Sequence, residues 1–209
     1  MQSVANQGGQ IGAQMRGNRL QKEQNELSKS NAYSTSGDRA GANEVKSLEA
    51  SQKAFSSPSP ENELAAFNSA KVSREAHMEA ARAAGNIGNR GAETFHQNAA
   101  KEAESRMEHH QEALSKMAAD SKSAYDEAAK APVTSPEGHQ ELATLARQAA
   151  AAENAYGSVS PGVKSDAEGG MGPKEYIKAA EAHERAAKTM SAVTPNQQMT
   201  NDGGDGSGA

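Results

Sequence analysis

The longest uninterrupted pattern in this chain is an apolar stripe with helical spacing between residues 95 and 128. Its members are Phe95, Ala99, Ala103, Met107, His110, Leu114, Met117, Ser121, Tyr125 and Ala128. Because positions three and four apart share one face of an α-helix, the stripe predicts a single long helix. Most of its members are small or polar, so the face is thin. A helix of this kind packs against other thin helices and not around a globular core.

The rest of the sequence offers few side chains for a conventional core. Its 209 residues include 3 Phe, 4 Tyr and no Trp, and much of the 35% hydrophobic fraction is alanine. A fully buried large side chain stabilises a fold by roughly 1.5–3 kcal/mol, and few are present. No segment alternates with the period of a β-strand. We therefore expect an all-α fold of three to four alanine-rich amphipathic helices in an elongated hairpin or bundle, with disordered termini.

Local start and stop signals divide the chain. Ser-Pro-Glu at 59–61 and again at 135–137 combines a favoured N-cap, a proline suited to the first helical position and an acid suited to the first turn. Gly-Pro at 172–173 opens the last helix, and Thr94 with Gln97 resembles a capping box. The predicted helices span about 60–84, 94–130, 136–156 and 173–192, within a helical region over 60–192. The region 1–59 is predicted to be polar and largely disordered, with a short helix near 42–55 whose apolar stripe is Val45, Leu48 and Phe55; the tail over 193–209 is predicted to be disordered.

The chain also repeats a phrase. EAHMEAAR at 75–82 and EAHERAAK at 181–188 share the pattern E-A-H-x-x-A-A-basic, and all but one of the six histidines begin a related pattern. In a helix each histidine then lies one turn before small residues, which allow two backbones to approach. We interpret the phrase as a helix-contact unit; chance recurrence in alanine-rich helices is the alternative. The candidate contact residues are His77, Ala80, Ala81, Phe95, Ala99, Met107, His110, Leu114, Met117, Tyr125, Leu142, Leu145, Ala149, Tyr156, Tyr176, Ala180, His183, Ala187 and Met190.

Phrases such as YIKAAEAHERAAK resemble the Ala/His-rich helical segments of some phage head-associated proteins and other bacterial structural proteins. The resemblance covers 75–84, 94–119 and 174–192. It implies a structural or assembly role in a virion or bacterial setting, and it carries over no catalytic residue.

Catalytic and metal chemistry find little support in the sequence. There is no cysteine, which excludes disulfides and zinc–thiolate sites. Glu93-x-x-His96 has the spacing of half a di-iron carboxylate site, but Ala180 stands where the fourth helix would supply the second half. Adjacent His109 and His110 diverge on a helix. We therefore predict no enzyme activity, no cofactor and no metal.

The leading hypothesis is a non-enzymatic helical assembly or interaction protein whose Ala/His faces bind copies of itself or a larger protein. Net charge −5 argues against a nucleic-acid surface, and no apolar run is long enough to span a membrane. We expect a soluble protein, cytoplasmic or in a virion, without a signal peptide. The alternative is a hydrophilic stress protectant, which low mean hydropathy of −0.84 would suit. Because histidine titrates near pH 6.5, acidification is expected to loosen the helix contacts.

Overall fold

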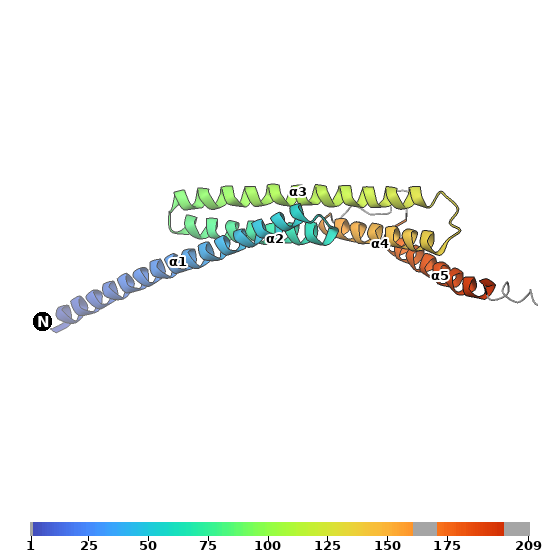
Figure 1. Cartoon of the computed structure of the whole chain (residues 1–209). Coiled ribbons are helices and arrows are strands. Elements are labelled where there is room, and N and C mark those ends of the chain that lie inside the picture. Colours follow the sequence, from blue (N-terminus) through green and yellow to red (C-terminus); the bar gives the residue numbers. More distant parts are fainter. Residues whose placement is uncertain (1, 161–170, 199–209) are drawn as a thin grey trace, which may run out of the picture. The chain divides into compact units, whose positions relative to one another are not determined.

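The computed structural model describes residues 2–160 and 171–198, and the side chains of 17–160 and 171–192. The described residues form five α-helices and no strand: α1 Gln2–Ser56, α2 Pro60–Asn86, α3 Arg90–Ala128, α4 Pro136–Val159 and α5 Pro173–Gln198 (Figure 1). The prediction of an all-α fold is confirmed. The prediction of three to four helices is wrong. Residues 193–198 of the predicted disordered tail belong to α5, whereas 161–170 and 199–209 lie outside the described residues.

The start signals act where the sequence placed them for three helices. The Ser59 hydroxyl accepts a hydrogen bond from the Asn62 backbone N–H at 3.2 Å, and Ser135 accepts one from Gly138 at 3.1 Å. At α3 the prediction was wrong, because the helix begins four residues before Thr94. The Asn89 side chain caps it by accepting from the Ala92 N–H at 3.1 Å. The Thr94 hydroxyl instead donates back to the Arg90 carbonyl within the helix.

Helix α1 is the helix that the four main predicted helices do not include. It extends far beyond the short helix expected near 42–55. Residues that are buried or half-buried recur along it in steps of three and four. This inner seam consists of Tyr33, Ser36, Ala40, Asn43, Ser47, Ala50 and Ala54. It is built from small and polar side chains, so it does not register as an apolar stripe. The predicted stripe of Val45, Leu48 and Phe55 lies on the exposed side, where Phe55 is 87% exposed.

The chain forms two compact units. Unit 1 comprises residues 1–56 and 65–108, and unit 2 comprises 57–64 and 109–209. In unit 1, α1 runs antiparallel to α2, since Arg39 pairs with Glu79 and the Ser73 hydroxyl donates to Glu44. Buried Ala40, Ala76 and Ala80 allow the backbones of these two helices to approach closely.

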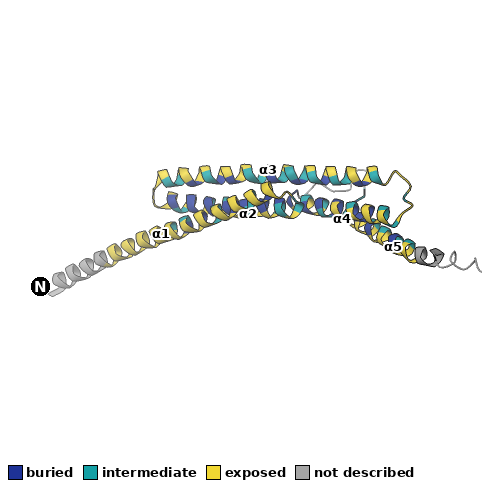
Figure 2. Cartoon of the chain, in the orientation of Figure 1, coloured by how far each residue is buried: buried dark blue, intermediate teal, exposed yellow. Residues whose placement is uncertain are grey.

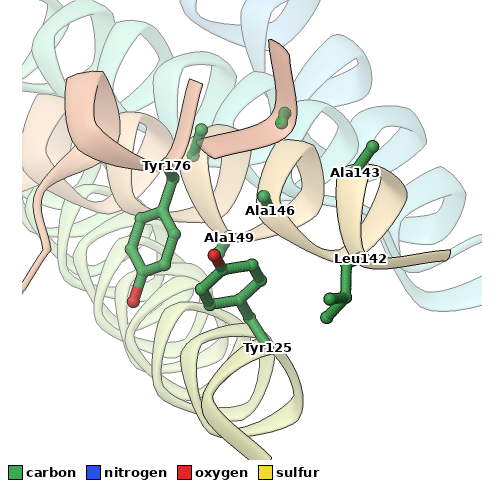
Figure 3. Close-up of a cluster of buried hydrophobic side chains, with 8 residues drawn as sticks. Tyr125, Leu142, Ala143, Ala146, Ala149 and Tyr176 are labelled. Carbon is green, nitrogen blue, oxygen red and sulfur yellow. The ribbon is translucent and has the colours of Figure 1, made fainter. Parts of the chain in front are cut away.

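Unit 2 contains the larger apolar cluster. Its buried members are Tyr125, Leu142, Ala143, Ala146, Ala149, Ala150, Tyr176 and Ala180. Figure 3 shows Tyr125 of α3 and Tyr176 of α5 beside the alanines of α4, which leave room for the two rings. The rings meet edge to face with centroids 5.4 Å apart. In both units the buried residues form narrow stripes along the helices (Figure 2). No described helix has the length and apolar character needed to cross a membrane.

Candidate functional site: histidine and carboxylate contacts between helices

Both copies of the repeated phrase place their histidine against another histidine. In unit 1, Nδ1 of His77 on α2 lies 3.0 Å from Nδ1 of His96 on α3. In unit 2, Nδ1 of His183 on α5 lies 3.0 Å from Nδ1 of His139 on α4. The ring centroids are 5.3 and 5.2 Å apart, and the ring planes are inclined by 37° and 34°. The phrase therefore recurs with the same contact geometry, once in each unit.

Each histidine pair favours a single protonation pattern. Two nitrogens 3.0 Å apart can share one hydrogen, with one ring donating and the other accepting. A proton on the accepting nitrogen as well would remove the acceptor and turn that ring into a buried cation whose N–H faces the N–H of the other ring. Burial lowers the pKa of His77 and of His96, and the pKa of His96 is lowered further by His77. Burial, followed by His139, lowers the pKa of His183 in the same way.

Glu44 of α1 joins all three helices of unit 1. Its carboxylate accepts two hydrogen bonds from Arg106 Nη2 of α3, at 2.8 and 2.7 Å, and one from the Ser73 hydroxyl of α2 at 2.6 Å. His77 Nε2 lies 3.7 Å from the same carboxylate, whose charge opposes the lowering of the His77 pKa. Arg106 acts in the opposite direction. One polar network in unit 1 thus contains the Glu44–Arg106 ion pair, the Ser73 hydroxyl and the histidine pair of His77.

Unit 2 has a second, more deeply buried polar contact. Nδ1 of His110 lies 2.6 Å from the Glu63 carboxylate, and the two side chains are 5% and 8% exposed. On the next residue, the Gln111 side-chain amide donates to the Ser160 hydroxyl at 2.8 Å. These contacts join the first turn of α2 and the end of α4 to α3. They add to the apolar contacts that α3 makes in unit 2 through the buried Leu114 and Tyr125.

Four buried polar atoms among the described side chains lack a hydrogen-bond partner: Ser47 Oγ, His77 Nε2, Arg106 Nε and the Tyr176 hydroxyl. Three of them lie in unit 1. The Tyr176 hydroxyl is enclosed in the unit 2 cluster, where burial raises the pKa of Tyr176 to about 12. An orphaned polar group of this kind costs stability.

The structure distributes the candidate contact residues over both units. Those that are buried are His77, Ala80, Ala81, His110, Leu114, Tyr125, Leu142, Ala149, Tyr176, Ala180 and Ala187. Those that are half-buried are Ala99, Met107, Met117, Leu145, Tyr156, His183 and Met190. Phe95 is 64% exposed, because the adjacent His96 takes the inward position of that turn.

Sequence reasoning missed the partners of these residues. Glu44, Glu63, Ser73 and Arg106 look like ordinary members of polar helix faces. Glu44 and Arg106 are 62 positions apart, so no local spacing connects them. The available signal was the heptad of small residues along α1, which would have shown that Glu44 adjoins a packed seam.

Among the described residues, no group of three or more His, Asp or Glu side chains could hold a metal ion. An open hollow of about 460 Å³ in unit 2 is lined by residues that include Pro60, Met117 and Asp120. The polar contacts between helices consist of two histidine pairs and of charge pairs such as Glu44–Arg106.

Comparison of the chain with protein-family models, with curated proteins and with solved structures finds no match in any of the three.

Proposed function

We propose that this chain is a non-enzymatic helical assembly protein that binds other protein chains through the outward faces of its helices. The observation that carries the proposal is an inversion of the usual burial pattern. The buried apolar residues are mostly alanines, whereas several of the largest apolar side chains are exposed. The exposed ones in unit 1 are Leu20, Leu27, Val45, Leu48, Phe55, Val72, Ile87 and Phe95.

The Ala/His faces are already occupied within the chain. His77 contacts His96, and His183 contacts His139, so these faces hold the helices of one chain together. The proposal therefore assigns them to intramolecular packing and assigns binding to the large apolar side chains that remain outside. Exposed apolar residues that gather on one face characterise surfaces that bind proteins.

Sedimentation and thermal melting at two protein concentrations a hundredfold apart test the proposal. An assembly protein sediments faster at the higher concentration, and its melting midpoint rises with concentration by mass action. A monomer at both concentrations, with a broad melt that does not depend on concentration, would overturn self-assembly and favour the hydrophilic protectant.

A further inference from the structure

Helix α1 carries a second heptad seam on the side away from α2 and α3. Its positions follow steps of four and three without interruption. This outer seam consists of Leu20, Gln24, Leu27, Asn31, Ser34, Asp38, Gly41, Val45, Leu48, Gln52 and Phe55. Every one of these residues is exposed, whereas every residue of the inner seam is buried or half-buried. Sustained 3–4 spacing is the pattern by which two helices pair in a coiled coil.

The first part of α1 lacks support within the chain. All side chains from residue 17 to 32, here called the arm, are exposed, and this part of the helix continues past the turn between α2 and α3 (Figure 1). The line of the inner seam continues into the arm as Arg19, Lys22, Glu26 and Lys29, which cannot form a small-residue contact. An isolated helix of about 15 residues is marginal in water. The arm therefore needs a packing partner to be stable as a helix. Its two leucines, Leu20 and Leu27, are 61% and 63% exposed and can contact that partner.

We propose that the outer seam of α1 binds the outer seam of a second copy of this chain, with the two helices antiparallel. This inference rests on the proposed assembly function and specifies its surface and partner. Antiparallel pairing places the arm of each copy on residues 45–55 of the other, which belong to the packed part of α1. Each arm gains support, and each copy covers the exposed Val45, Leu48 and Phe55 of its partner.

One antiparallel register matches the seam along its whole length. It places Leu20 opposite Phe55 and Leu27 opposite Leu48, because Leu20 and Leu27 are seven residues apart and so are Leu48 and Phe55. In the same register Gln24 lies within one residue of the position opposite Gln52, and side-chain amides can donate to and accept from one another. The interface is therefore self-complementary, as two-fold symmetry requires.

The centre of this register has room for a helix. Ser34 faces Gly41 there, and a Cβ added to Gly41 would meet nothing within 4 Å in the chain. Glycine inside a helix costs about 1 kcal/mol relative to alanine, and close approach of a second helix gives that residue a role. Four of seven positions in a coiled coil contact the partner, so the overlap engages about 20 residues from each copy, the lower bound of a standard interface.

Cysteine cross-linking tests the register, because the natural chain has no cysteine. Leu27→Cys and Leu48→Cys chains, carrying tags of different length, are mixed and oxidised. The expected product is the mixed disulfide, with little cross-linking of either variant alone. Self-cross-linking of Leu27→Cys without the mixed product would mean parallel pairing and would overturn the proposal.

A second measurement separates this surface from assembly in general. Leu27→Lys is expected to weaken association of the dimer, raising its dissociation constant about a hundredfold in sedimentation equilibrium, since each dimer loses two buried leucines. The matched control Asn25→Lys adds the same charge on the exposed arm at a position that does not face the partner, and leaves association within about twofold. Asp38→Asn is expected to tighten association, because it removes two like charges that meet at the centre of the seam.

These outcomes distinguish the two proposals. Association that persists in Leu27→Lys, or that occurs without the mixed disulfide, overturns the α1 surface but leaves an assembly protein. A monomeric wild-type chain at both concentrations overturns this inference and the proposed self-assembly together.

Discussion

Units 1 and 2 are built from the same alanine-rich helices but are stabilised by different interactions. The apolar cluster between α1 and α2 in unit 1 consists of three alanines, beside the polar network around Glu44. The cluster in unit 2 includes two tyrosines and a leucine from three helices. Where large side chains are present, burial supplies the energy. Between α1 and α2, where the clustered apolar residues are alanines, charge-assisted hydrogen bonds determine which helix faces meet.

The histidine pairs show what the two units share. Each unit has one pair with the same nitrogen distance of 3.0 Å, although the partners belong to different helices. In each unit the two rings lie against each other, with centroids 5.3 and 5.2 Å apart, and join two helices. The repeated phrase thus marks a common packing element, and the surrounding residues decide how strongly each unit depends on it.

The largest expected effect is in unit 2. Tyr176→Ala should lower the free energy of unfolding by about 3–5 kcal/mol, the usual cost of removing a fully buried aromatic ring. Tyr176 is 0% exposed, whereas the neighbouring Ile177 is 38% exposed, so Ile177→Ala is the control with a smaller loss. Denaturant unfolding measures both, and hydrogen exchange in α4 and α5 locates the change. Equal losses would show that the aromatic cluster does not dominate unit 2.

Unit 1 should respond most to loss of its carboxylate. Glu44→Ala leaves the charge of Arg106 without its partner and should cost about 3 kcal/mol, the lower end of the range for a broken buried pair. The lower end applies because the two side chains are 22% and 19% exposed. The exposed Glu49→Ala, on the same helix, should change stability by less than about 0.5 kcal/mol.

A double variant tests the reason for that loss. Glu44→Leu combined with Arg106→Met removes both charges and should recover most of the stability, because the cost arises from the unpaired charge. If the double variant is as unstable as Glu44→Ala, the network contributes in some other way, and the contrast between the units would need revision.

The sequence predicted the local parts of this fold well. The starts of α2, α4 and α5 follow from serine or glycine before proline, a signal contained within three residues. The long face of α3 followed from its own periodicity, and it was misplaced only at its first turn, where His96 and not Phe95 points inward. Features of this kind can be read from a single helix without knowledge of its neighbours.

What the sequence did not predict depends on contacts between distant positions. The inner seam of α1 consists of one tyrosine with serine, asparagine and alanine, so it has no apolar periodicity, and the hydropathy pattern favoured the exposed Val45 and Leu48 instead. The histidine–histidine and Glu44–Arg106 contacts require the register between helices. That register is fixed by close approach of alanine faces, and many alignments of alanine on alanine look alike in sequence.

Acidification should affect both units, by less than the substitutions above. The pKa values of His77, His96 and His183 are lowered in the folded chain, mainly by burial, from the ordinary value of 6.5. Above pH 6.5 these three histidines are mostly neutral in both the folded and the unfolded chain, so they add little pH dependence to the free energy of unfolding. As the pH falls below 6.5 the unfolded chain takes up protons first, so the melting temperature should decrease between pH 7.5 and 5.5.

Two variants give the control for this pH dependence. His77→Gln should reduce the slope of melting temperature against pH, because it removes one lowered pKa and separates His96 from its partner. The exposed His109→Gln should leave the slope unchanged. A melting temperature that is constant over this range, or a slope that is the same in both variants, would contradict the role given to the pairs.

The smallest expected change in the free energy of unfolding comes from removing single hydroxyl groups, and its sign should differ between the two units. Tyr176→Phe removes a buried hydroxyl that has no partner and should leave stability unchanged or raise it by up to about 1 kcal/mol. Ser73→Ala in unit 1 removes a hydroxyl that donates to Glu44 at 2.6 Å and should lower stability. Opposite signs in parallel unfolding measurements would show that unit 1 depends on its polar contacts while unit 2 tolerates their loss. A destabilised Tyr176→Phe would place a hydrogen-bonded group at that hydroxyl, and the two units would then differ less than their cores indicate.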